Sequence, residues 1–154
     1  MITIVPVCTS YQYAAAARLF TQYAQHIGVD LAFQNFAAEL LQLQNMYSPP
    51  TGIILLAKYK GKFIGCIALR KKETNIAELK RMYVLPSHKN KGVGQALLEA
   101  SILKATQLGY QKIWLDTLAT MLPAMHLYTK NGFYEIPAYY FNPNKNALFY
   151  ELII

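Results

Sequence analysis

The chain is organised around residues 84–95, which read Val-Leu-Pro-Ser-His-Lys-Asn-Lys-Gly-Val-Gly-Gln. An apolar strand leads into this stretch, and Pro86 ends the strand. A basic loop follows and connects directly to an amphipathic helix. Gly92 and Gly94 have no Cβ atom, so a ligand can approach the backbone closely there. The first N–H groups of a helix lack partners within the helix and, with the helix dipole, they suit phosphate. The stretch predicts a phosphate site to which Lys89 and Lys91 add charge; the alternative is an ordinary junction that carries glycine and lysine.

The residues before the loop predict three consecutive antiparallel strands. Their apolar runs are separated by Lys60-Gly61-Lys62 and by Glu73-Thr74-Asn75, both of which are typical of turns. The expected strands are 53–59, 63–69 and 76–85. A helix over about 92–108 follows the loop, and the next strand, 113–117, is reached through this helix. That connection predicts a parallel pairing between 76–85 and 113–117.

The two ends of the chain complete a mixed α/β (α+β) fold. Apolar residues at spacings of three and four predict one helix from Thr9 or Ser10 to Gly28, and a second from Asp30 to Pro49. The remaining expected elements are a short strand over 2–6, a short helix over 123–131, and strands over 133–140 and 147–154. We therefore expect one domain over residues 1–154, since a chain of 154 residues fits a single core.

Composition restricts the class of protein. Hydrophobic residues make up 54% of the chain and aromatic residues 13%, which excludes a disordered chain. No apolar run is long enough to span a bilayer and the start of the chain lacks the pattern of a signal peptide, so we expect a cytoplasmic protein without a membrane partner. Cys8 and Cys66 lie in strand-like stretches and are expected to be buried thiols. No Cys/His cluster has metal-ligand spacing, so no metal is expected.

The net charge of +7 predicts an anionic partner. Nucleic acid is one candidate, but the sequence has no arginine-rich run and no nucleic-acid-binding motif. A small phosphate-bearing ligand at the loop is the other candidate, and it accounts for the lysines between residues 80 and 91.

Three motifs, taken in order along the chain, resemble the GCN5-related N-acetyltransferase (GNAT) superfamily. A strand that contains Glu78 precedes Lys89-x-x-Gly92-x-Gly94, and Leu127-Tyr128-x-x-x-Gly132-Phe133 follows. In that family the loop reads Arg/Gln-x-x-Gly-x-Gly/Ala and holds the pyrophosphate of acetyl-CoA, so Lys89 is a departure. The resemblance implies a splayed, mixed, mostly antiparallel sheet of six to seven strands flanked by about four helices. It also implies an acyl-CoA-dependent N-acetyltransferase with acetyl-CoA as co-substrate.

The resemblance also assigns residues to the cofactor. The strands that end near Met82 and Asp116 are expected to part, and the main chain of Met82, Tyr83 and Val84 is expected to bind the pantetheine arm between them. The expected cofactor-binding residues are Met82, Tyr83, Val84, Lys89, Asn90, Lys91, Gly92, Val93, Gly94, Gln95, Asp116 and Tyr128.

Acetyl transfer needs a neutral amine, a donor for the oxyanion and a proton for the leaving thiolate. By resemblance Tyr128 is the general acid; the alternative is a tyrosine that only packs in the core. Glu78 is the candidate base, and strand alternation puts it on the same face as Met82. The alternatives are that Glu78 pairs with Lys80, with Arg81 or with a lysine on the next strand, and that a water chain removes the proton. No cysteine lies in a nucleophile motif, so we expect direct attack.

The acceptor is expected to be an amine of a small molecule or peptide, and the sequence does not identify it. The rival hypotheses are a CoA-binding sensor or scaffold without transfer activity and a basic nucleic-acid-binding module. The aromatic run Tyr139-Tyr140-Phe141-Asn142-Pro143 favours ordinary sheet packing, with a wall of the acceptor site or a dimer surface as the alternatives. Both a monomer and a homodimer remain open.

Overall fold

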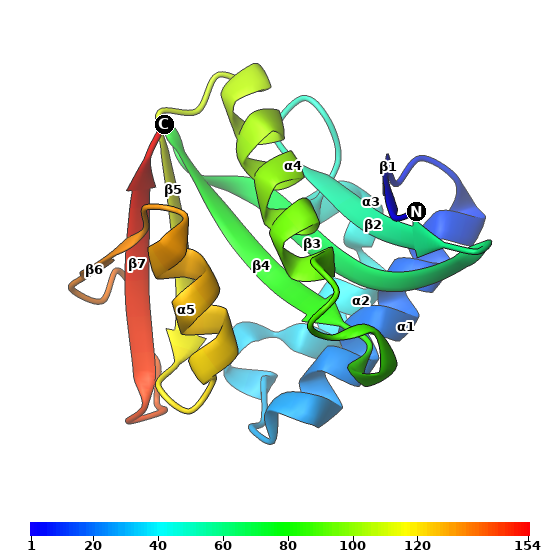
Figure 1. Ribbon diagram of the computed structural model, residues 1–154. Coiled ribbons are helices and arrows are strands. Elements are labelled where there is room, and N and C mark those ends of the chain that lie inside the picture. The colour runs from blue at the N-terminus through cyan, green and yellow to red at the C-terminus, as the bar shows by residue number, and fades with distance from the viewer.

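A seven-stranded mixed sheet forms the centre of the structure, a computed structural model that describes residues 1–154. The strands are β1 (Thr3–Pro6), β2 (Ile53–Tyr59), β3 (Lys62–Glu73), β4 (Ile76–Val84), β5 (Lys112–Leu118), β6 (Tyr134–Ile136) and β7 (Ala147–Ile153). Their spatial order is β1-β2-β3-β4-β5-β7-β6, and every neighbouring pair is antiparallel except β4 and β5 (Figure 1). The expected mixed, mostly antiparallel sheet and its one parallel pair are confirmed.

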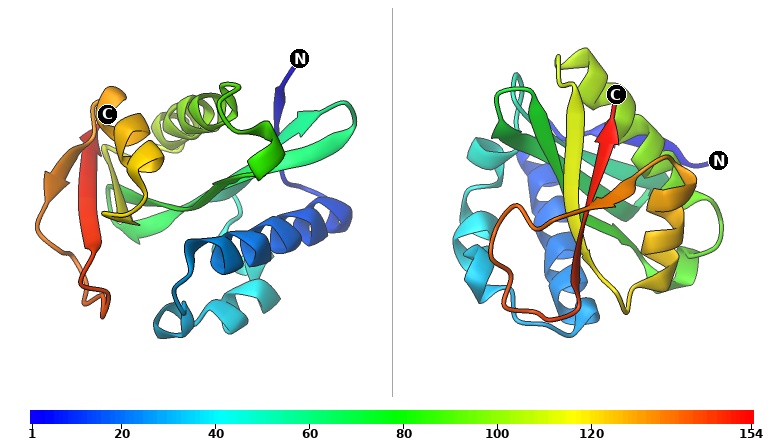
Figure 2. Two further views of the ribbon diagram at one scale, coloured as in Figure 1. Left: turned by 60° about the horizontal axis from the view of Figure 1, so that its bottom comes forward. Right: turned by 90° about the vertical axis from the view of Figure 1, so that its left-hand side faces the viewer.

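Helices cover both faces of the sheet. Their bounds are α1 (Ser10–Ile27), α2 (Phe36–Leu41), α3 (Leu43–Met46), α4 (Val93–Gln107) and α5 (Leu122–Lys130). Figure 2 (left) shows α1, α2 and α3 on one face and α4 and α5 on the other. Each face has its own core: 18 buried residues pack under α4, and 12 pack under α1. Burial of these two apolar sets is the main force that holds the layers together.

The first helix begins and ends where the sequence predicts, but the second does not form as one piece. Thr9 and Gln12 form a reciprocal capping box at the start of α1, and Gly28, with a φ of 71°, ends it. The helix expected from Asp30 to Pro49 is instead a 3₁₀ turn (Ala32–Gln34) followed by α2 and α3. Asn35 breaks it with a φ of 56°, and Gln42 breaks it again with a φ of −132°. The structure therefore has five α-helices where about four were expected.

The strand expected over 133–140 is also shorter than predicted. Only Tyr134–Ile136 pairs with β7, and residues 137–146 leave the sheet as an irregular segment (Figure 2, right). This segment carries the aromatic run, so the run is not part of a strand. The rings of Tyr139 and Tyr140 nevertheless pack on Phe149 of β7, and Tyr139 also packs on Trp114 of β5, as sheet packing predicts. We call residues 137–146 the strap.

Two findings concern the cysteines and the length of the helices. Cys66 is buried as expected, and its Sγ atom donates to the carbonyl oxygen of Arg81. Cys8 is exposed, contrary to expectation, because β1 ends at Pro6 and Cys8 lies in the connection to α1. None of the helices combines the length and the apolar character that crossing a membrane requires.

The sheet parts between its two parallel strands. Only the first three residues of β4, Ile76 to Glu78, pair with β5, and both strands then continue without pairing to each other. Figure 1 shows β4 and β5 diverging toward the end of the sheet where α5 begins. Past the split, the main-chain groups of β4 on this side have no strand to pair with, so they are free to bind a ligand. The splayed sheet implied by the resemblance is confirmed.

Candidate active site

A β-bulge at Arg81 decides which way the side chains of β4 point. Cys66 on β3 lies opposite Tyr83, whereas Ala68 lies opposite Lys80, so one residue of β3 faces two of β4. Arg81 adopts a left-handed conformation with a φ of 60°, which is strained for a residue that has a side chain. The alternation of β4 therefore shifts by one residue at this point.

The shift corrects the expectation that Glu78 and Met82 share a face. Before the bulge, Ala77 and Leu79 belong to the core under α4, so Glu78 between them points to the α1 face. After the bulge, Met82 packs against the core under α4 while Tyr83 belongs to the core under α1. Glu78 and Met82 thus lie on opposite faces of the sheet.

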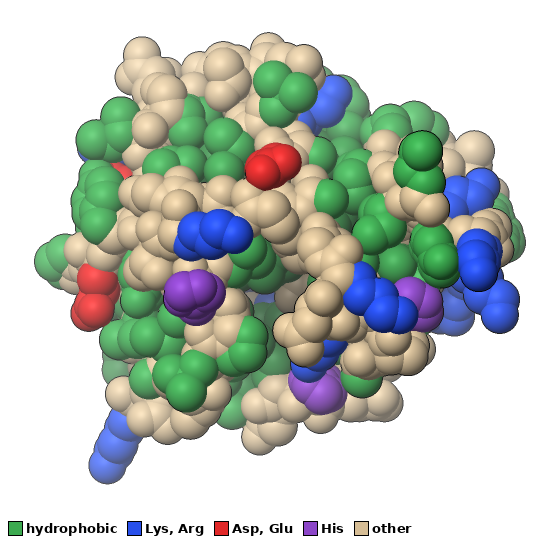
Figure 3. Space-filling view, viewed as in Figure 1, with side chains coloured by type: hydrophobic (Ala, Val, Ile, Leu, Met, Phe, Trp, Pro, Cys, Tyr) green, Lys and Arg blue, Asp and Glu red, His purple; other side chains and the backbone are tan.

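A cleft of about 750 Å³ runs along the loop that joins β4 to α4; we call it the loop cleft. Nine of the expected cofactor residues line it: Met82, Tyr83, Val84, Lys89, Asn90, Gly92, Val93, Gly94 and Gln95. Lys91 belongs to the same loop but does not line the cleft. The opposite wall comes from α5 and the turn before it, and Figure 3 shows histidine and lysine side chains around the hollow. The cleft is therefore large, open and cationic at its rim.

The loop conformation presents backbone N–H groups to this cleft. Gly92 stands at the start of α4 with a φ of 81°, and no side chain caps the helix there. A Cβ atom at Gly92 would meet no protein atom within 4 Å, so the space beside it is open. At Gly94 a Cβ atom would lie 3.3 Å from Leu127, which shows how closely α4 approaches α5. Uncapped N–H groups at a helix start form an anion site.

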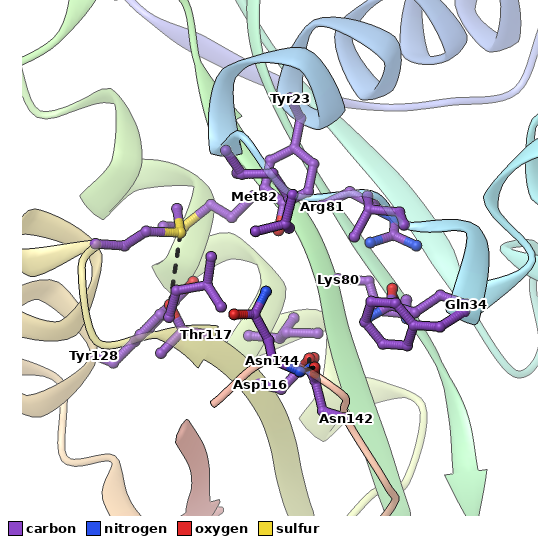
Figure 4. Close-up of a pocket in the computed structure, with 17 residues that line it drawn as sticks. Tyr23, Gln34, Lys80, Arg81, Met82, Asp116, Thr117, Tyr128, Asn142 and Asn144 are labelled. Atoms are coloured by element: carbon purple, nitrogen blue, oxygen red, sulfur yellow. Dashed lines mark hydrogen bonds between the residues drawn. The ribbon is translucent and has the colours of Figure 1, made fainter. Parts of the chain in front are cut away.

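A second, smaller cavity of about 40 Å³ lies deeper, where β4 and β5 have separated; we call it the inner pocket. Its walls come from α1, the segment 29–34, both strands, α5 with the turn before it, and the strap (Figure 4). The polar residues that line it are Tyr23, Gln34, Lys80, Arg81, Asp116, Thr117, Tyr128, Asn142 and Asn144. The loop cleft and the inner pocket share four residues, namely Tyr23, Ile27, Met82 and Met121. A ligand in the cleft therefore meets a ligand in the pocket beside Met82.

Tyr128 lies at this meeting point. It is buried on α5, its ring packs on Phe133 and Tyr150, and it lines the inner pocket, while the preceding Leu127 lines the loop cleft. Burial raises the pKa of the Tyr128 hydroxyl, and the nearby Tyr23 and Asp116 raise it further. The hydroxyl is thus protonated at neutral pH and available as a proton donor.

Glu78 is held in a closed network away from both cavities. Its side chain is 1% exposed; Oε1 accepts from Nε of Arg70 at 2.9 Å, and Oε2 accepts from the hydroxyl of Tyr139 at 2.6 Å. Burial alone would raise the pKa of Glu78, but the charges of Lys80 and Arg70 and the hydrogen bond from Tyr139 lower it overall. Both oxygens are occupied and the pKa is low, so this arrangement makes Glu78 a weak proton acceptor. Its ion-pair partner is Arg70 on β3, which the sequence interpretation did not name.

Asp116 belongs to the inner pocket and does not line the loop cleft. Its Oδ2 atom accepts from the hydroxyl of Tyr140 at 2.5 Å and from Nδ2 of Asn142 at 3.4 Å. The cofactor role expected for Asp116 stays a prediction, and the structure places the residue in the inner pocket and not among the residues that line the loop cleft. Tyr140 and Asn142 come from the strap, and of the run 139–143 only Asn142 lines the inner pocket.

Sequence reasoning missed two further contacts at the pocket. Arg81 donates from Nε and Nη2 to the carboxylate of Glu39 at 2.9 and 2.8 Å, and both side chains are buried. Lys80 donates from Nζ to Oε1 of Gln34 at 3.2 Å. No sequence pattern marks either pair, since the partners come from α2 and the 3₁₀ turn. Asn35 was the one available signal for a chain break there, because asparagine tolerates the left-handed conformation.

Comparisons with known proteins agree with this geometry. The profile of a family described as Acetyltransferase (GNAT) family matches residues 15–133, more than half of the chain. A Schizosaccharomyces pombe protein named an uncharacterized N-acetyltransferase is 38% identical over 136 residues, which cover 87% of this chain and 83% of that protein. The crystal structure of a GNAT-family acetyltransferase from Staphylococcus aureus has a TM-score of 0.81 at 24% identity over 98% of both chains.

A second solved structure is that of a protein with a bound cofactor. The Salmonella typhimurium protein yncA, solved with its cofactor acetyl-CoA, has a TM-score of 0.70 at 19% identity, and the match covers 99% of this chain and 93% of that one. At such identities the two structural matches show that the fold is shared.

Proposed function

The chain belongs to the GNAT family of acetyltransferases, and from that premise we propose that it transfers the acetyl group of acetyl-CoA to a primary amine by direct attack. As a member of this family it is an acyl-CoA-dependent N-acyltransferase. One observation carries the proposal: the loop cleft opens beside Met82 into a separate pocket, at the place where β4 and β5 part.

The loop cleft fits the co-substrate on three grounds. The N-terminus of α4 has no side-chain cap, the space beside Gly92 is open, and lysines stand at the rim. In the proposal the N–H groups of residues 90–95 bind the pyrophosphate. The main chain of Met82, Tyr83 and Val84, which β5 leaves unpaired, binds the arm that leads to the thioester. Lys89 adds positive charge at the position where the family usually has arginine or glutamine.

The inner pocket supplies the acceptor side of the reaction. The amine nitrogen bonds to the acetyl carbon, the carbon–sulfur bond breaks, and the sulfur takes a proton from the hydroxyl of Tyr128. Solvent then returns a proton to Tyr128. The proton lost by the attacking amine passes to water, because both oxygens of Glu78 are already engaged. Substrates that displace water from this small pocket strengthen each of these polar contacts, because the local dielectric falls.

Release of free thiol from acetyl-CoA tests the proposal. Purified protein is mixed with acetyl-CoA and a panel of primary amines, and thiol and acetylated amine are measured together. The proposal predicts amine-dependent thiol release in equal amount to acetylated product. A protein that acetyl-CoA stabilises by about 2.7 kcal/mol at a hundredfold excess over Kd, yet that acetylates no amine, would instead be a sensor or scaffold. Absence of both effects would contradict cofactor binding itself.

A further inference from the structure

The charges around the inner pocket do not all cancel. Two ion pairs are complete: Nη2 of Arg81 lies 2.8 Å from Oε1 of Glu39, and Nε of Arg70 lies 2.9 Å from Oε1 of Glu78. All four of these groups are therefore matched within the protein. One cation and one anion that line the pocket, Lys80 and Asp116, remain outside these pairs.

Lys80 and Asp116 are connected to each other only through neutral groups. Nζ of Lys80 donates to Oε1 of Gln34 at 3.2 Å, and Nε2 of Gln34 donates to the hydroxyl of Tyr140 at 3.0 Å. Tyr140 in turn donates to Oδ2 of Asp116 at 2.5 Å. Every donor in this chain points from the lysine toward the carboxylate. Lys80 and Asp116 form no ion pair, with each other or with any other residue.

A charge that lines a pocket without an ion-pair partner is energetically unfavourable, so the position of Lys80 indicates what kind of ligand the inner pocket binds. Lys80 is partly buried, its ammonium lies in no ion pair, and its one hydrogen bond goes to a neutral amide. Burial lowers the pKa of Lys80, and the nearby charges of Glu78 and Asp116 offset this only in part. Functional sites are where such uncompensated groups are found, because a ligand supplies the missing charge. Figure 4 shows Lys80 beside Gln34 on one side of the pocket, and Asp116 with Asn142 on another.

We propose that the acceptor is a small amino-carboxylate, such as an amino acid, whose carboxylate binds Lys80 and whose amine is held by Asp116. The inference rests on the proposed function, since it names the substrate of the same site. Asp116 shares the pocket with Tyr128 and Met82, so an amine beside it lies on the side where the loop cleft joins the pocket. Asn142 and Asn144 of the strap line the same pocket and provide further amide groups for the ligand.

The same features argue against other acceptors. A polyamine would place a second ammonium near Lys80, with only the single carboxylate of Asp116 to offset it. A lysine within a folded protein brings no free carboxylate, and a cavity of about 40 Å³ beneath the strap leaves little room for a polypeptide. The pocket therefore fits a compound about the size of one amino acid.

Matched acceptors test the inference on the wild-type protein. The value of kcat/KM is measured by thiol release for an amino acid, for its carboxamide, and for the amine that lacks the carboxyl group; alanine, alaninamide and ethylamine form one such set. Loss of a charged hydrogen bond predicts a preference for the amino acid of about 10- to 150-fold. The amino group of the carboxamide loses its proton more easily than that of the amino acid, so intrinsic reactivity favours the carboxamide. A preference for the amino acid therefore measures the binding of its carboxylate.

A pair of lysine variants locates the preference. Lys80→Met removes the ammonium and keeps the apolar stem, so the ratio of acid to amide should fall to near one while the KM for acetyl-CoA is unchanged. Lys71→Met, an exposed position on β3 outside both cavities, should keep the wild-type ratio.

The outcomes separate this inference from the proposed function. Equal use of acid and amide by the wild-type protein, or an unchanged preference in Lys80→Met, overturns the amino-carboxylate assignment and leaves the transferase intact. No thiol release with any amine overturns both. Because the wild-type ratio alone decides the first point, a Lys80→Met protein that fails to fold does not weaken the test.

Discussion

The loop cleft and the inner pocket meet at Met82, yet they are built in opposite ways. Half of the residues that line the loop cleft come from one stretch, residues 82–95, whose main chain we propose binds the ligand, and the cleft is wide and open. The inner pocket is lined by side chains from α1, the segment 29–34, β4, β5, α5 and the strap, and it is much smaller. A backbone site suits a ligand that stays the same, whereas a side-chain site can be altered residue by residue. Substitutions in the two regions should therefore affect different steps.

The largest effect is expected at Tyr128. Because this residue lines the inner pocket and not the loop cleft, its substitution should lower kcat without changing the affinity for acetyl-CoA. Tyr128→Phe keeps the ring against Phe133 and Tyr150 but removes the proton donor, so kcat should fall by about 10²- to 10⁴-fold. The Kd for acetyl-CoA should hardly change, as titration calorimetry can measure. Tyr11→Phe, exposed on α1, is the matched control. A normal kcat in Tyr128→Phe would falsify the general-acid assignment.

The next effect concerns the ion pair that anchors the bulge. Glu39→Ala leaves the buried guanidinium of Arg81 without its partner, so the free energy of unfolding should fall by about 3–5 kcal/mol. Adding Arg81→Gly removes the stranded charge and suits the φ of 60°, so the double variant should recover part of that loss. Denaturant unfolding measures all three proteins.

The control for this pair is Glu135→Ala, an exposed carboxylate on β6, which should change the free energy of unfolding by no more than about 0.5 kcal/mol. If Glu39→Ala were as stable as this control, the inner pocket would not depend on the ion pair between Arg81 and Glu39. The claim that distant side chains build this pocket, in contrast to the loop cleft, would then be contradicted.

A third effect should appear in the loop cleft alone. Gly92→Val forces a β-branched residue into a φ of 81° at about 1–3 kcal/mol of strain, so the loop should distort and the Kd for acetyl-CoA should rise about 5- to 150-fold. Gly109→Val is the matched control, because Gly109 has a φ of 91°, equally open surroundings and a position at the far end of α4. Equal Kd values for the two variants would show that cofactor binding does not use the loop.

The smallest effect is expected when the pH is lowered and the free energy of unfolding is measured. Because the pKa of Glu78 is lower in the folded protein than its ordinary value of 4.5, the carboxylate stabilises the fold above that pH. This stabilisation should be lost as the pH falls from about 4.5 through the lowered pKa of the folded state. The free energy of unfolding of the wild type should therefore fall more steeply with acid than that of Glu78→Gln. Parallel curves would mean that the network around Glu78 contributes no such linkage.

The sequence was sufficient wherever the structure depends on neighbouring residues. The loop 84–95 could be predicted because glycine placement, proline and helix start are local features. The parallel pairing of β4 with β5 followed from the intervening helix, and the start of α1 at Thr9 or Ser10 followed from residues that can cap a helix. Family resemblance added the splayed sheet, which no local pattern indicates.

The rest depends on contacts between distant residues. Arg81, which has a left-handed conformation, donates hydrogen bonds to Glu39, 42 positions earlier in the chain. An arginine in a sequence does not by itself indicate a bulge. Tyr139 reaches Glu78 across 61 positions, and Tyr140 reaches Asp116 across 24. Local periodicity describes none of these pairs, which is why the sheet face of Glu78, the cavity that Asp116 lines and the contacts of the strap could be seen only in the folded chain.

Titration of isotope-labelled protein with acetyl-CoA, followed by the amide signals of each residue, tests the central claim most directly. If the start of α4 binds the pyrophosphate and the parted strand binds the arm, the largest changes should fall on the amides of residues 90–95 and 82–84. Saturable binding that leaves both sets of amides unmoved, with the changes elsewhere in the chain, would contradict the account.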